Sequence, residues 1–156
     1  MKVLFMCTAN SCRSVLSEGL FNHWAPSGFT GVSSGSFPSM QLNPRAVSTL
    51  QALGIDTTDL YSKGSEVFSN SPPDVVITVC DKARGEPCPV YFGPAVKSHW
   101  GLADPSDVKG TESDIQAAFD ATVVQIGRRF KAFFSLDHSA LKPQELKREL
   151  DRIGEL

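Results

Sequence analysis

The sequence has few of the features that mark a membrane protein, a nucleic-acid-binding protein or a secreted disulfide scaffold. No apolar run is long enough for a signal peptide or a membrane span, since the one at residues 3–6 meets a polar loop at once. The formal net charge is only -2, so no excess of positive charge attracts nucleic acid or an anionic membrane. We therefore expect a cytoplasmic protein, in which four cysteines are catalytic, redox-active or metal-binding.

Internal repeats, low-complexity tracts and domain linkers are also lacking, and the three histidines are scattered along the chain. Apolar residues make up 41% and charged residues 21%, which is ordinary for a globular domain. The cysteines Cys7, Cys12, Cys80 and Cys88 lie 5, 68 and 8 positions apart, which matches no common zinc pattern. A zinc site is thus the weakest alternative, and we expect neither a metal nor a cofactor.

The apolar pattern predicts an α/β domain. Short apolar runs predict parallel strands at residues 3–6, 29–34, 74–79 and 96–100. Helical spacing predicts helices at residues 14–24, 44–53, 112–134 and 139–153. The alternation predicts a three-layer single domain, with a mainly parallel sheet of about four strands flanked by helices.

Two segments stand apart from this regular pattern. Residues 81–93 contain glycines and prolines, so we expect a loop or a weak helix there. Residues 137–156 are expected to form a C-terminal helical extension to a domain of residues 1–136. That amphipathic extension either covers the domain or contacts a partner.

The strongest functional signal is the loop between the first strand and the first helix, Cys7-Thr8-Ala9-Asn10-Ser11-Cys12-Arg13-Ser14. Five residues between Cys7 and Arg13 allow backbone N–H groups to surround a tetrahedral oxyanion, and the following helix adds its positive end. Arg13 can bind two oxygens and favours a thiolate at Cys7, to which Ser14 can donate a hydrogen bond. The predicted oxyanion-binding residues are Thr8, Ala9, Asn10, Ser11, Cys12 and Arg13. The alternative is a buried core thiol beside a solvated arginine.

Two further cysteines favour redox chemistry. Cys80 follows a predicted parallel strand, so it is expected at the same sheet edge as Cys7. Cys88 lies in the glycine- and proline-containing segment, which can move its sulfur into reach. The alternative is two unrelated thiols, one packed and one exposed.

Several segments resemble one known family. The loop from Cys7 to Ser14 is similar to that of the low-molecular-weight tyrosine phosphatases and of the arsenate reductases that share their fold. The reductase pattern is also matched by Ser17-Glu18-Gly19, Asn43-Pro44, Thr78-Val79-Cys80 and His99-Trp100-Gly101-Leu102-x-Asp104-Pro105. The resemblance spans roughly residues 1–135 and implies a low-molecular-weight phosphatase-like fold.

The resemblance implies a thioredoxin-coupled arsenate reductase. In such an enzyme Cys7 is expected to attack the oxyanion, Arg13 to hold its oxygens, and Asp104 to protonate the departing oxygen. By the same resemblance, a Cys7–Cys80 disulfide is expected to form first and a Cys80–Cys88 disulfide second. Arsenate is the expected partner, with phosphate or sulfate as mimics. Thioredoxin is the expected reductant, with glutaredoxin or glutathione as second choice.

Two other functions stay open. A low-molecular-weight tyrosine phosphatase would use the same loop, but that branch typically has tyrosines after Asp-Pro, where this chain has Ser106-Asp107-Val108. A non-catalytic oxyanion sensor would bind the anion without turnover. The alternative to a catalytic role for Asp104 is that it only caps a helix or turn. His99 and Trp100 are expected to be structural.

The chain departs from the family at two positions. Ala9 stands where many reductases have glycine, and a left-handed backbone there would be costly. Lys63 stands where potassium-binding relatives have an aspartate. We expect its ammonium group to take the place of the ion and pair with Glu18, the alternative being an exposed loop lysine.

Overall fold

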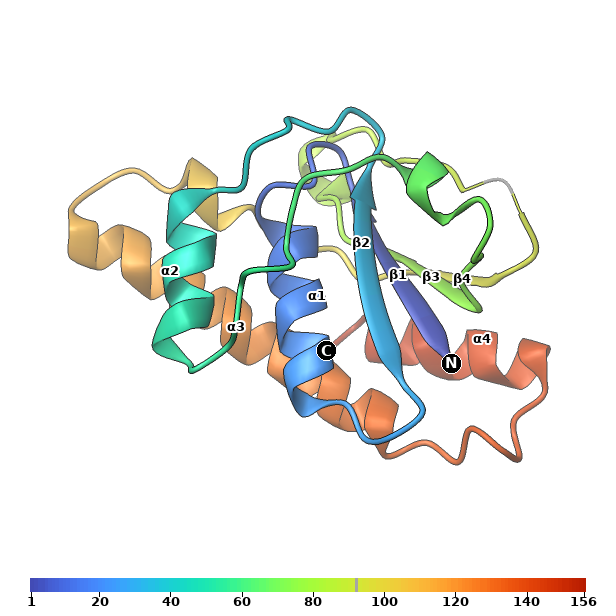
Figure 1. Ribbon diagram of the computed structural model, residues 1–156. Coiled ribbons are helices and arrows are strands. Elements are labelled where there is room, and N and C mark those ends of the chain that lie inside the picture. The colour runs from blue at the N-terminus through green and yellow to red at the C-terminus, as the bar shows by residue number, and fades with distance from the viewer. Residues whose placement is uncertain (92) are drawn as a thin grey trace.

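The structure, a computed structural model, describes residues 1–91 and 93–156 (Figure 1). Position 92, within the loop predicted for residues 81–93, lies outside the described residues. The strands are β1 (Lys2–Cys7), β2 (Thr30–Gly35), β3 (Val75–Thr78) and β4 (Val96–His99). The α-helices are α1 (Arg13–Trp24), α2 (Pro44–Ala52), α3 (Glu112–Phe134) and α4 (Pro143–Ile153). Three short 3-10 turns are η1 (Ser65–Phe68), η2 (Lys82–Arg84) and η3 (Pro105–Asp107).

The four strands form one parallel sheet in the order β2-β1-β3-β4. This confirms the predicted α/β fold. The loops that follow the strands gather at the upper edge of the sheet in Figure 1. Because β1 and β3 are neighbours, Met6 pairs with Thr78, and the residues after both strands meet at this edge.

The two faces of the sheet are covered differently. Alternate residues of β1 and β3, such as Val3 and Ile77, join the large core with α1, α3 and α4. The opposite face carries Leu4 and Val76, which pack with Phe68 of η1 and other partly buried residues. The strands are therefore buried on both sides, which accounts for their continuous apolar runs.

Local signals set the helix ends. The side chain of Asn43 accepts hydrogen bonds from two backbone N–H groups of α2, whose first residue is Pro44. Thr111 and Asp114 form a capping box at the start of α3. The last helix begins at Pro143 rather than at residue 139, because proline is favoured in a first turn and its ring clashes further inside.

Helix α4 packs on the rest of the molecule. Leu146, Leu150 and Ile153 are buried in the large core, and Trp100 Nε1 donates a hydrogen bond to the carbonyl oxygen of Leu150 at 2.8 Å. Of the two roles open for this segment, covering the domain is the one observed. Within the described residues, every helix is too short or too polar to cross a bilayer.

Candidate active site

The loop from Cys7 to Ser14 joins the end of β1 to the start of α1 and is held from outside by its carbonyl groups. Backbone N–H groups of residues 36, 37, 39 and 43 donate to the carbonyl oxygens of Cys7, Thr8, Ala9 and Ser11. These carbonyls are therefore turned to the neighbouring segment, an arrangement that leaves loop N–H groups for an anion. Gly35 lets the segment approach, since a Cβ there would lie 2.5 Å from the Thr8 carbonyl oxygen.

Left-handed backbone occurs in this loop at Asn10, whose φ is 49°, and not at Ala9. Asparagine tolerates this conformation better than alanine, so the cost expected for Ala9 does not arise. The Asn10 side chain is fully buried and donates to Ser14 Oγ at 2.8 Å and to Ser33 Oγ at 2.9 Å. Asn10 thus ties the loop to α1 and β2.

The predicted nucleophile lies in this cradle. Cys7 Sγ is 2.9 Å from Ser14 Oγ, and the backbone N–H of Asn10 donates to the same sulfur at 3.3 Å. Because Ser14 Oγ already accepts from the Asn10 amide, its own proton is free for Cys7. Two donors on one sulfur stabilise a thiolate.

Cys12 is a different kind of thiol. It is buried, and this burial raises its pKa far above the ordinary value, with a further rise from the charge of Asp104. The charge of Arg13 lowers the same pKa but does not outweigh burial. A thiol held protonated is a poor nucleophile, so packing is the role that its surroundings support.

Arg13 is bound by a carboxylate of the protein itself. Its two terminal nitrogens each donate to Glu86 at 2.7 Å, and one also donates to the Leu102 carbonyl oxygen at 3.2 Å. The hydrogen bond from Arg13 lowers the pKa of Glu86, against the opposing effect of burial. A bidentate carboxylate occupies the same donor fork that would bind two oxyanion oxygens.

Asp104 combines the two roles considered for it. Its Oδ1 accepts from the backbone N–H and hydroxyl of Ser106 at 3.0 and 2.7 Å, which caps η3. Its Oδ2 lies 3.4 Å from Arg13. The cap fixes the carboxyl group, and the other oxygen faces the anion site. Asp104 and Arg13 line a cleft of about 580 Å³. The other residues that line this cleft are Asp81, Arg84, Glu86, Asp107 and Lys109.

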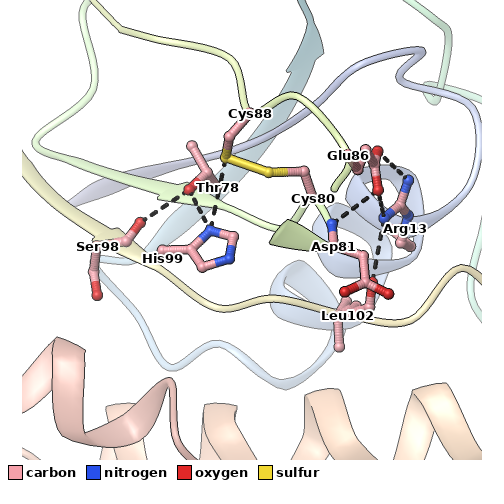
Figure 2. The surroundings of a disulfide bond; sticks show 9 residues. All are labelled: Arg13, Thr78, Cys80, Asp81, Glu86, Cys88, Ser98, His99 and Leu102. Carbon is pink, nitrogen blue, oxygen red and sulfur yellow. Dashed lines mark hydrogen bonds and ion pairs between the residues drawn. A yellow bond between two sulfur atoms is a disulfide. The ribbon is translucent and has the colours of Figure 1, made fainter. Parts of the chain in front are cut away.

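Cys80 and Cys88 form a disulfide, with their Cα atoms 5.6 Å apart (Figure 2). Cys80 is fully buried two residues after β3, whereas Cys88 is half-buried in the loop that follows η2. The alternative of two unrelated thiols is therefore wrong. Figure 2 also shows Glu86, from the loop between these cysteines, reaching to Arg13.

The buried lysine expected beside the loop is present. Lys63 Nζ lies 3.4 Å from Glu18 Oε1 and donates to the Tyr61 carbonyl oxygen at 3.1 Å. Ser33 donates to the same Glu18 oxygen at 2.6 Å. Lys63 is only 7% exposed, so the alternative of a solvated loop lysine is wrong.

The fold thus brings together the predicted nucleophile, the loop, Arg13 and Asp104, and it joins Cys80 to Cys88. Sequence reasoning missed Glu86. An acidic residue between two cysteines of a glycine- and proline-containing loop was the available signal, but loops carry no periodicity that would direct its side chain.

The chain belongs to the low molecular weight phosphotyrosine protein phosphatase family, whose model matches residues 2–152. An arsenate reductase of Shouchella clausii is 33% identical over 131 residues, covering 84% of this chain and 93% of that protein. The thioredoxin-dependent arsenate reductase structure from Corynebacterium glutamicum has a TM-score of 0.60 and 27% identity, over 83% of this chain and 60% of that one. The arsenate reductase structure from Archaeoglobus fulgidus has a TM-score of 0.71 at 22% identity, over 86% and 99%, and supports the fold.

Proposed function

We propose that this protein reduces arsenate to arsenite through three cysteines and is recycled by thioredoxin. The observation that carries the proposal is the Cys80–Cys88 disulfide at the sheet edge where Cys7 ends β1. Hydrolysis of a cysteinyl-phosphate needs water and no further thiol, whereas reduction needs two electrons that a pair of thiols supplies. The arsenate reductases among the relatives support the same assignment.

The first step is an in-line attack of the Cys7 thiolate on arsenic. Arg13, loop N–H groups and the start of α1 hold the oxyanion, which requires Glu86 to leave the guanidinium group. Asp104 gives a proton to the departing oxygen, which leaves as water or hydroxide.

Two attacks of a thiolate on sulfur complete the reaction. The Cys80 thiolate attacks the Cys7 sulfur, the sulfur–arsenic bond breaks, and its electron pair stays on arsenic as arsenite departs. Cys88 then attacks Cys80, Cys7 leaves as thiolate, and the Cys80–Cys88 disulfide results. The more accessible sulfur of Cys88 is then open to the thiolate of thioredoxin.

The deciding experiment measures arsenate-dependent NADPH consumption with thioredoxin and thioredoxin reductase. Wild type is compared with Cys7→Ser, Cys80→Ser and Cys88→Ser, and with His23→Gln as an exposed control at the far end of α1. We expect each cysteine variant to lose turnover and the control to keep it. Turnover by Cys80→Ser and Cys88→Ser at the wild-type rate would refute the cascade.

A phosphatase assay covers the alternative supported by the family match. The shared loop predicts weak hydrolysis of aryl phosphates that depends on Cys7 alone. Fast phosphotyrosine hydrolysis without arsenate reduction would make this protein a tyrosine phosphatase.

A further inference from the structure

The end of β4 places a histidine against the disulfide. His99 pairs with Thr78 in the register of β3 and β4, and Thr78 lies two residues before Cys80 in the chain. Its Nδ1 lies 3.8 Å from Cys88 Sγ and 2.8 Å from Thr78 Oγ1. Figure 2 shows both contacts converging on the same ring nitrogen.

This position of His99 matters for the attack of Cys88 on Cys80. The role that we infer from it therefore rests on the proposed function. Cys88 reacts as a thiolate, yet an ordinary cysteine has a pKa of about 8.5 and is only about 3% ionised at neutral pH. The proton must leave Cys88 before or during its attack on Cys80. The structure is that of the product, in which the Cys88 sulfur has just bonded to Cys80.

We propose that His99 is the proton acceptor for Cys88. Nδ1 takes the Cys88 thiol proton as the Cys88 sulfur attacks the Cys80 sulfur of the Cys7–Cys80 disulfide. The Cys88 electron pair forms the new sulfur–sulfur bond, and the pair of the broken bond stays on Cys7 as thiolate. The positive charge ends on the imidazolium group, which is half-buried and returns its proton to solvent.

Thr78 is suited to both protonation states of His99. Its hydroxyl can donate to a neutral Nδ1 and, after turning, accept from a protonated one. In the second orientation its proton can point to the Ser98 carbonyl oxygen, which is 3.5 Å from Thr78 Oγ1. The hydroxyl therefore holds the ring in place without favouring one charge state strongly.

The surroundings keep His99 neutral before the step. Burial lowers its pKa below the ordinary value, and the positive charges of Lys82 after β3 and Arg129 on α3 lower it further. The charge of Asp81 and a hydrogen bond to the Thr78 backbone oppose the shift without reversing it. A neutral imidazole is the form that can accept a proton.

The test follows one turnover without a reductant. Reduced protein is mixed with arsenate, quenched in acid and alkylated, and mass spectrometry measures how fast Cys7–Cys80 converts to Cys80–Cys88. His99→Gln retains a polar planar side chain but cannot take a proton, and His23→Gln is the matched control. Because the thiolate fraction caps the effect at about 30-fold, we expect conversion in His99→Gln to be about tenfold slower near pH 7.

The pH profile separates proton transfer from a structural role. Near pH 9 an ordinary thiol is ionised without help, so we expect His99→Gln to approach the wild-type rate there. Conversion at the wild-type rate near pH 7 would overturn the proposal. Slowing by the same factor at both pH values would also overturn it, since damage to the fold is not repaired by hydroxide.

A second measurement needs no arsenate. The rate at which iodoacetamide modifies Cys88 in the reduced protein reports how readily this thiol loses its proton to a neighbouring base. We expect modification near pH 7 to be severalfold faster in wild type than in His99→Gln, with the difference lost near pH 9. If wild type forms no arsenite, the proposed function fails. Equal modification rates in wild type and His99→Gln would, independently of that result, reject His99 as the proton acceptor.

Discussion

The carboxylate of Glu86 binds the guanidinium group of Arg13 through two hydrogen bonds of 2.7 Å each. Glu86 lies in the loop closed by the Cys80–Cys88 disulfide, and its Oε2 also accepts from the Asp81 backbone N–H at 2.8 Å. In the oxidised protein the main anion-binding side chain is therefore already occupied by an anion of the same chain.

We expect Glu86 to compete with oxyanions in the oxidised protein. Glu86→Gln removes the negative charge from the Arg13 fork, so the oxidised variant should bind sulfate about tenfold more tightly than oxidised wild type. Isothermal titration calorimetry measures this difference. Glu149→Gln, on the exposed face of α4, is the control. Unchanged sulfate affinity in Glu86→Gln would show that the carboxylate does not block the site.

The same pair predicts a pH dependence. Arg13 lowers the pKa of Glu86 in the folded protein, so the pair's contribution to stability is complete above the unfolded value of about 4.3. That contribution declines as the pH falls below the unfolded value and is gone once the pH has fallen through the lowered pKa of the folded protein. Urea unfolding of the oxidised protein should show wild type losing more stability than Glu86→Gln over this acid range. Parallel losses in the two proteins would exclude Glu86 as the cause.

Asp104 offers a way to separate proton donation from capping. Asn retains an oxygen that can accept from Ser106, so Asp104→Asn should fold normally but lack the acid. We expect arsenate turnover to fall about 100-fold or more, whereas the reduced variant still binds sulfate. Parallel turnover and calorimetric measurements check this. A variant with wild-type turnover would leave Asp104 with its capping role alone.

Lys63 and Glu18 predict independence from potassium. Because the Lys63 ammonium group pairs with Glu18 next to Asn10 and Ser33, an added cation has no charge left to neutralise. Arsenate turnover should be equal in sodium and potassium buffers. Strong activation by potassium would contradict this prediction.

Removing one partner of that pair should destabilise the fold. Lys63→Met leaves Glu18 as a buried, uncompensated charge, at a cost of about 3 kcal/mol in the free energy of unfolding. The double variant Lys63→Met with Glu18→Gln removes both charges and should recover much of this loss. Urea unfolding measures both. A double variant as unstable as the single one would exclude the charge as the cause.

The division into residues 1–136 and a 137–156 extension stays a prediction. A substitution at Leu150 measures how much the extension contributes to the free energy of unfolding. Leu150 is fully buried, so Leu150→Ala should lower the free energy of unfolding by about 2–5 kcal/mol. Leu156→Ala, at the exposed chain end, is the control and should change little. Thermal unfolding measures both. A Leu150→Ala protein as stable as wild type would make the extension dispensable.

Much of the fold was predictable because strands and helices produce local patterns of apolar residues in the sequence. Buried parallel strands require continuous apolar runs, and amphipathic helices require a repeat near 3.6 residues, so both appear directly in the sequence. The cradle from Cys7 to Ser14 was predictable for the same reason, since its nucleophile and arginine are near neighbours in the chain. The last helix was predicted to begin at residue 139, but it begins at Pro143 because proline is favoured in the first turn of a helix.

The sequence by itself therefore determined the α/β class, the anion loop and the placing of Cys7 and Cys80 at the carboxyl ends of parallel strands. Only the tertiary structure decided which side chains meet across that edge. Glu86 reaches an arginine 73 positions away, and the register of β3 and β4 sets the position of His99 beside the disulfide. Such contacts depend on strand order and on loops that have no repeating pattern, so no local signal specifies them.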